Sequence, residues 1–285
     1  MDTKIALVPK STEELVKDAE NIQYKLYMRA NALRNSLERL VNEALKLFKI
    51  KSNKNLANNI NLLSKIVDEK MIKKLHSIRL VGNNGSHEVL HQELTEKKIN
   101  ENILFLHSFC ENILAYYINH LPNELESYPW LFRILSTLVP QHRINILRRV
   151  FDVKGEDIVV DKLSMAYVKN NQFKEGLNIL NLALDKKYIT KDSHTFLSGK
   201  IERLEARKDT IPIAQGLEES ARNFSAVKKE VELNKSKINW PIEVYISIVG
   251  WILDDYKDRD WTDEEYKSHL QSSLRINFGI ISVNK

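Results

Sequence analysis

The stretch LVKDAENIQYKLYMRANALRNSLERLVNEALKLF, residues 15–48, decides the fold class. Its apolar residues recur at alternating steps of three and four, which is the spacing of one face of an α-helix. The stripe consists of Leu15, Ala19, Ile22, Leu26, Ala30, Leu33, Leu37, Leu40, Ala44 and Phe48. Because no Gly or Pro interrupts it, the pattern predicts one helix on the order of 55 Å long. Such a helix needs an antiparallel neighbour within the chain, a second subunit, or both.

The chain as a whole has the composition of an all-α protein. It contains only 8 Gly and 6 Pro in 285 residues, whereas sheet proteins need many turn residues. Further helical stripes cover Leu56 to Val67, Glu69 to Ile78, and Ile99 to Leu121, where Pro122 ends the pattern. We therefore expect a four- to five-helix bundle over residues 1–121 and a C-terminal helical region over residues 122–285.

One helical hairpin is expected within the C-terminal region. Residues 157–184 resemble a single tetratricopeptide-type helix pair. Small residues in such a pair allow two helices to cross closely, and large residues fill the remaining space. Ser164, Gly176 and Ala183 occupy the small positions, and Leu163, Tyr167 and Leu180 the large ones.

Composition limits the classes of function. Hydrophobic content of 43% and charged content of 28% are ordinary for a globular protein, and a net charge of +5 is compatible with nucleic acid as a partner. The single cysteine, Cys110, excludes an internal disulfide and fits a reducing compartment. We see neither an apolar segment of membrane-spanning length nor a signal peptide, and expect a cytoplasmic protein without membrane contact.

The candidate site is the stretch Ile78-Arg79-Leu80-Val81-Gly82-Asn83-Asn84-Gly85-Ser86-His87. Two glycines in a Gly-poor chain predict a break in the helix here. Arg79, Asn83 and His87 stand at intervals of four, so they share one stripe of a helix or meet at a helix junction. They are the candidate catalytic residues. The alternative is a tight turn whose polar groups cap helix ends.

Two other pieces accompany this stretch: Leu33-Arg34-Asn35-Ser36-Leu37-Glu38-Arg39-Leu40 and the helix from Leu62 to Val67. Together they resemble the HEPN superfamily (higher eukaryotes and prokaryotes nucleotide-binding), in a branch found fused to restriction and helicase subunits. The resemblance covers roughly the first 120 residues. It implies a helical bundle that forms a homodimer and works within a larger protein complex of a prokaryotic antiviral defence or nucleic-acid-processing system.

In active members of that superfamily the Arg and His of two subunits form a cleft that cuts RNA without metal. An imidazole can take a proton from the ribose 2′-hydroxyl, and a guanidinium can stabilise charge on the phosphate. Seven residues separate Arg79 from His87 here, more than in the nuclease branch, which favours a binding or scaffolding role. A metal-independent endoribonuclease of the abortive-infection type is the second hypothesis. An accessory subunit whose C-terminal helices dock on a larger ATPase or nuclease is the third.

Two weaker sequence patterns are further candidates for functional sites. His87-Glu88-Val89-Leu90-His91 matches the H-E-x-x-H zinc-protease string, but an all-α chain without a recognisable third ligand does not favour zinc, and we expect no metal or other cofactor. Arg143, Arg148, Arg149 and Lys154 form a basic group that could contact phosphates of nucleic acid. A solvated helix face explains the same group.

Overall fold

The computed structural model describes residues 10–85, 94–128, 131–132, 135–136, 138–211 and 213–215. These residues form nine α-helices and no β-strand, which confirms the predicted all-α class. None of those helices is both long enough and apolar enough to span a bilayer. By its contacts the chain divides into two compact units, Ile5–Tyr116 and Tyr117–Lys285, the second also taking Met1–Lys4.

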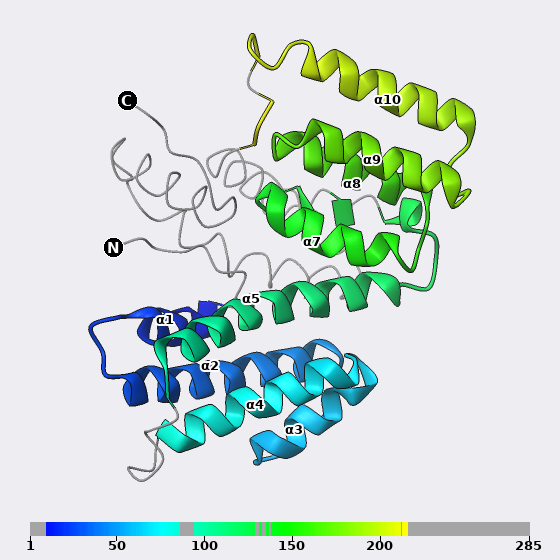
Figure 1. Cartoon of the computed structure of the whole chain (residues 1–285). Helices are drawn as coiled ribbons and strands as arrows, with labels where there is room; N and C mark the ends of the chain where they lie inside the picture. Colours follow the sequence, from blue (N-terminus) through cyan, green and yellow to red (C-terminus); the bar gives the residue numbers. More distant parts are fainter. Residues whose placement is uncertain are drawn as a thin grey trace, which may run out of the picture. The chain divides into compact units, whose positions relative to one another are not determined.

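The first unit is a bundle of helices (Figure 1). Its elements are α1 (Lys10–Glu20), α2 (Leu26–Leu47), α3 (Leu56–Leu62), the 3-10 turn η1 (Leu63–Lys65), α4 (Glu69–Gly85) and most of α5 (Glu96–Asn119). The helices expected from Leu56, from Glu69 and from Ile99 are therefore present. Helix α2 packs against α1, α3 and α4.

The predicted single helix from Leu15 to Phe48 is wrong, because the chain turns between α1 and α2. The Asn21 side-chain Oδ1 accepts a hydrogen bond from the Gln23 amide at 3.0 Å, and the Tyr24 amide donates to the Asn21 carbonyl at 3.0 Å. Such local bonds compete with the helical ladder. Ile22, assigned to the buried stripe from the sequence, is 76% exposed in this turn.

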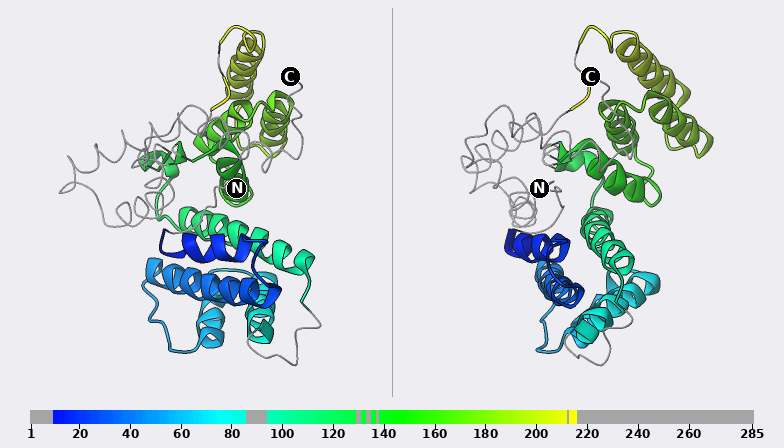
Figure 2. Two further views of the ribbon diagram at one scale, coloured as in Figure 1. Left: turned by 90° about the vertical axis from the view of Figure 1, so that its left-hand side faces the viewer. Right: turned by 60° about the vertical axis from the view of Figure 1, so that its left-hand side comes forward.

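Helix α1 folds back onto α2, as the views in Figure 2 show. This packing helps to cover the apolar stripe. Leu33 and Leu37 are 0% exposed and Leu40 is 2% exposed. The antiparallel neighbour within the chain is thus the partner that the stripe required. Self-association is not needed to bury it.

Helix α5 runs parallel to α2 along the first unit. At their N-terminal ends Arg29 of α2 contacts Glu96 and Asn100 of α5. At their C-terminal ends the Phe48 and Tyr116 rings pack edge to face, with centroids 5.5 Å apart. Helix α4 runs antiparallel to α2, since the C-terminal Gly82 of α4 lies against Ala30 and Arg34 near the start of α2.

The second unit is built from short helices that pack in sequence order: α7 (Pro140–Phe151) on α8 (Asp157–Lys169), α8 on α9 (Phe173–Asp185), and α9 on α10 (Lys191–Glu205). The helical hairpin predicted for residues 157–184 is α8 and α9. Gly176 lies at their crossing: an added Cβ would be 3.1 Å from the Ser164 carbonyl oxygen. Residues 216–285 of the expected C-terminal helical region lie outside the described residues.

Candidate functional site

No helix break occurs at Gly82, because α4 continues from Glu69 to Gly85, and the residues directly after Gly85 lie outside the described residues. Arg79 and Asn83 therefore lie one helical turn apart on the same side of α4. His87, the third candidate, lies outside the described residues, as does His91 of the H-E-x-x-H string. The described chain thus places two of the three candidate catalytic residues together.

Gly82 serves close packing between helices and not a turn. A Cβ built at this position would overlap the Cβ of Arg34 and lie 3.0 Å from the Ala30 carbonyl oxygen. The absence of a side chain lets α4 approach the backbone of α2 directly. The sequence signal was therefore correct in marking Gly82 as special, but the reason is helix contact.

Asn83 is held by Arg34 on α2. The Arg34 Nε donates to Asn83 Oδ1 at 2.9 Å, and Arg34 also pairs with Glu38 one turn later, at 3.4 Å. These two side chains come from two of the three sequence stretches that carry the HEPN resemblance. Arg34 belongs to one of those stretches, but its sequence position does not assign it to the site. Only the antiparallel approach of α2 and α4 brings it there.

Arg79 is half-buried, and its Nε has no hydrogen-bond partner among the described residues. His76 precedes it by three residues on α4 and was not predicted as a site residue from the sequence. The His76 Nε2 lies 2.8 Å from Asn61 Oδ1 on α3. An amide oxygen only accepts hydrogen bonds, so Nε2 carries a proton, and in the neutral ring Nδ1 then keeps its lone pair. Partial burial, followed by the charge of Arg79, lowers the pKa of His76 below 6.5.

These contacts define what the α2–α4 surface can do chemically. Arg34 is committed to Asn83 and Glu38, which makes it a bridge between helices. Arg79 and a neutral His76 supply a guanidinium and a proton acceptor on one helix face. Within the described ranges no three His, Cys, Asp or Glu side chains gather where they could hold a metal ion.

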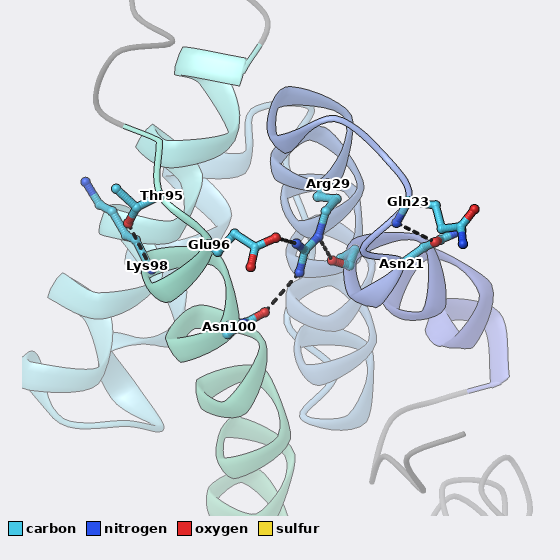
Figure 3. A network of polar contacts seen from close by, with 8 residues as sticks. Asn21, Gln23, Arg29, Thr95, Glu96, Lys98 and Asn100 are labelled. Carbon is cyan, nitrogen blue, oxygen red and sulfur yellow. Dashed lines mark hydrogen bonds and ion pairs between the residues drawn. The ribbon is translucent and has the colours of Figure 1, made fainter. Parts of the chain in front are cut away.

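A second polar cluster joins α1, α2 and α5 inside the bundle (Figure 3). Arg29 is 1% exposed, yet all three of its side-chain nitrogens donate hydrogen bonds. Nε donates to the Ala19 carbonyl at 2.8 Å, one terminal nitrogen to Glu96 at 3.2 Å, and the other to Asn100 at 2.9 Å. Arg29 thus donates to a carbonyl in the last turn of α1, and it links α5 to α2 through Glu96 and Asn100. This role is structural.

The four basic residues predicted as a phosphate-binding group do not form one surface of the second unit. Arg143 is 7% exposed and donates to Gln215 Oε1 at 2.7 Å. Arg148 lies over the Phe151 ring, and Arg149 donates to the Asn145 carbonyl. Lys154 donates to the carbonyls of Leu121 and Asn123. These different surroundings do not favour the prediction that the four bind phosphates together.

Cys110, the single cysteine, is half-buried on α5. Desolvation, with a second contribution from the charge of Glu111, raises the pKa of the Cys110 thiol far above its usual range. The nucleophilic form of cysteine is the thiolate. Cys110 is therefore a neutral thiol at physiological pH and not a candidate nucleophile.

Comparison with known proteins gives one match. Residues 21–129 are similar to a family described as a domain of unknown function (DUF4145). The matched segment runs from the α1–α2 turn through η3 (Leu125–Ser127) and includes Arg34, Arg79 and Asn83. No curated protein and no solved structure matches the chain.

Proposed function

We propose that this chain is a HEPN-like component of a prokaryotic antiviral defence or nucleic-acid-processing system. It acts by self-association and by contact with protein or nucleic acid, with little or no catalysis of its own. The observation that supports this most is the Arg34 Nε–Asn83 Oδ1 hydrogen bond of 2.9 Å. It joins two of the three stretches that carry the HEPN resemblance, and it uses both side chains for helix packing.

A working nuclease site needs its polar groups available to substrate. The oxygen of Asn83 accepts from Arg34, and Gly82 beside it packs against the same arginine. A motif built in this way stabilises the α2–α4 pair. The residues of this motif then determine how α2 and α4 pack in the bundle, which supports a binding or scaffolding component.

Self-association has a candidate surface at the α1–α2 corner. Three apolar side chains lie exposed there: Ile22 at 76%, Tyr24 at 39% and Met28 at 42%. Exposed apolar side chains favour protein contact, because their burial releases water. The HEPN resemblance makes a second copy of the chain the expected partner.

Light scattering on the purified full-length chain tests this proposal. The wild type is expected to be a dimer at micromolar concentration, and a double variant with Ile22→Glu and Met28→Glu a monomer. Phe196→Glu is the matched control, since Phe196 is 67% exposed in the other unit. A monomeric wild type would remove self-association from the proposed function. If Phe196→Glu disrupts the dimer as much as the double variant does, the α1–α2 corner is not the dimer surface.

Contact with nucleic acid is tested separately with a fluorescently labelled single-stranded RNA. Anisotropy is expected to show salt-sensitive binding that weakens in Arg79→Gln, because each phosphate contact contributes a salt-dependent term. Glu101→Gln on the exposed side of α5 is the control. If Arg79→Gln binds RNA as the wild type does, Arg79 is not part of a nucleic-acid surface.

A metal-independent endoribonuclease remains the second candidate function because of His76 and Arg79. The lowered pKa leaves His76 neutral at physiological pH, so Nδ1 can accept a proton. Arg79, one turn away, can stabilise phosphate charge. The test is RNA cleavage in EDTA: the nuclease hypothesis expects cleavage that His76→Gln and Arg79→Gln each reduce by roughly a hundredfold or more.

A further inference from the structure

The second unit contains a cavity of about 560 Å³, bounded by α7, α8, α10 and residues 132–136. Its apolar lining consists of Phe132, Leu135, Leu147, Ile158, Met165 and Ala166. The volume lies within the range of small-ligand sites, whose walls are mostly apolar. Because the cavity is lined by residues of the second unit, its role is independent of the α2–α4 site and of the proposed function.

Helix α8 supplies the largest share of the cavity lining. Ile158, Lys162, Met165 and Lys169 follow one another at steps of four, three and four, so they share one face of the helix. Ile158 and Met165 are half-buried, which leaves part of their apolar surface open to the cavity. The flexible thioether of a methionine adapts to apolar ligands of irregular shape. This face of α8 therefore offers apolar contact to a ligand.

The carboxylate of Asp161, which also lines the cavity, is already bonded to two lysines of the lining. Lys162 Nζ lies 2.9 Å from one carboxylate oxygen, and Lys200 Nζ lies 3.2 Å from the other. Burial by itself would raise the pKa of Asp161, but the two lysines outweigh it, so the pKa is lowered below 3.8. Asp161 therefore stays ionised at neutral pH and keeps both lysines.

Arg143 and Lys169 are engaged within the protein as well. Gln215 Oε1 accepts from an Arg143 terminal nitrogen at 2.7 Å and from Lys169 Nζ at 3.3 Å, and both cations have further interactions beyond this oxygen. A charged ligand would have to break such bonds before it made its own, and that leaves partly buried groups without their partners. Glu126, also in the lining, is exposed, so water and salt screen its field.

From this arrangement we infer that the cavity binds a neutral, mostly apolar small molecule, such as an aryl or alkyl alcohol. The apolar side chains supply the contact, and the release of water from them drives binding. An uncharged ligand leaves the bonds of Asp161, Arg143 and Lys169 intact. A peptide suits the cavity less well, because its backbone amides and carbonyls need hydrogen-bond partners, and these side chains are already bonded within the protein.

Fluorescence titration of the full-length chain with N-phenyl-1-naphthylamine tests the inference. This neutral apolar probe brightens on leaving water, and we expect saturable binding of one probe per chain. Three competitors share a phenylbutyl group: 4-phenylbutan-1-ol is neutral, 4-phenylbutyrate is an anion, and 4-phenylbutylamine is a cation. The alcohol is expected to displace the probe. Each charged analogue is expected to compete about tenfold more weakly or worse, because its charge loses water without gaining a partner.

A fourth competitor separates a free small molecule from a peptide. Acetylphenylalanine amide carries the phenyl ring on a peptide backbone. It is expected to compete about tenfold more weakly than 4-phenylbutan-1-ol, because its backbone groups lose their bonds to water.

Two variants show whether the probe occupies this cavity. Met165→Trp fills the space beside α8 and is expected to abolish binding, and Ile158→Asn makes the wall polar and is expected to weaken binding about tenfold. Both residues are half-buried, so both variants are expected to fold, which circular dichroism checks. Phe196→Trp is the matched control. It places the same indole at an exposed position of α10 and should bind the probe as the wild type does.

The inference fails if the probe shows no saturable binding at micromolar concentration, or if Met165→Trp binds it as well as Phe196→Trp does. It also fails if 4-phenylbutyrate or 4-phenylbutylamine competes as well as the alcohol, because the charged side chains of the lining would then recognise the ligand. Equal competition by acetylphenylalanine amide would contradict a free small molecule and make a peptide the occupant.

Discussion

Replacing Gly82 with Ala should destabilise the N-terminal bundle, although Ala ordinarily favours a helix. The gain in helix propensity is about 1 kcal/mol. Against it, the new Cβ would overlap the Arg34 Cβ and sit 3.0 Å from the Ala30 carbonyl oxygen. Neither atom can swing away, because both are fixed to the α2 backbone. Overpacking of this kind costs about 1–3 kcal/mol, and displacing α4 also breaks the Arg34–Asn83 hydrogen bond, worth about 1 kcal/mol.

The expected net effect of Gly82→Ala is a loss of about 1–3 kcal/mol in the free energy of unfolding. Urea denaturation followed by far-ultraviolet circular dichroism measures it. Gly199→Ala in α10 is the matched control: its Cβ would meet only the Arg203 guanidinium, at 3.6 Å. That control should stabilise the chain by up to about 1 kcal/mol. If Gly82→Ala stabilises the chain as much as Gly199→Ala does, the close contact of α2 and α4 is wrong.

Three further predictions concern single side chains. Arg29→Met should lower the free energy of unfolding by about 2–4 kcal/mol, because the Ala19 carbonyl loses its donor. Arg29→Lys should recover only part of this loss. A loss below about 0.5 kcal/mol in Arg29→Met would contradict the buried network. His76 has a lowered pKa in the folded chain, so the unfolded chain binds more protons below pH 6.5 and stability should fall as pH falls through 6.5. Thermal melts should show a weaker pH dependence there in His76→Gln, and an unchanged dependence would contradict the lowered pKa. Cys110 in the native chain should react with iodoacetamide far more slowly at neutral pH than in the urea-unfolded chain, and equal rates would contradict its raised pKa.

Much of the fold could be predicted from periodicity alone. The stripe in α5 and the small residues of the α8–α9 hairpin have strong local signals, and the structure matches them. The turn at Asn21 could not be predicted in this way. Its flanking apolar residues keep helical spacing, and only the packing of α1 back onto α2 makes the turn favourable. Tertiary contact overrode local propensity there.

In the candidate site, too, contacts within one helix could be predicted from the sequence, whereas contacts between helices could not. Arg79 and Asn83 could be grouped from their spacing on one helix. The partner of Asn83 is Arg34, which precedes it by 49 residues, and no sequence periodicity reports that distance. Gly82 was singled out correctly from its rarity. Its role as a helix-contact residue follows only from the position of α2.

One combined measurement tests the central claim, that the α2–α4 motif mainly holds the bundle together. It is thermal unfolding of Asn83→Ala together with RNA cleavage in EDTA by the wild type, Arg79→Ala and His87→Ala. We expect Asn83→Ala to lose about 1–3 kcal/mol of stability, because Arg34 loses its acceptor, and the wild type to leave the RNA intact. Metal-free cleavage that disappears in Arg79→Ala and His87→Ala, with Asn83→Ala as stable as the wild type, would contradict the account.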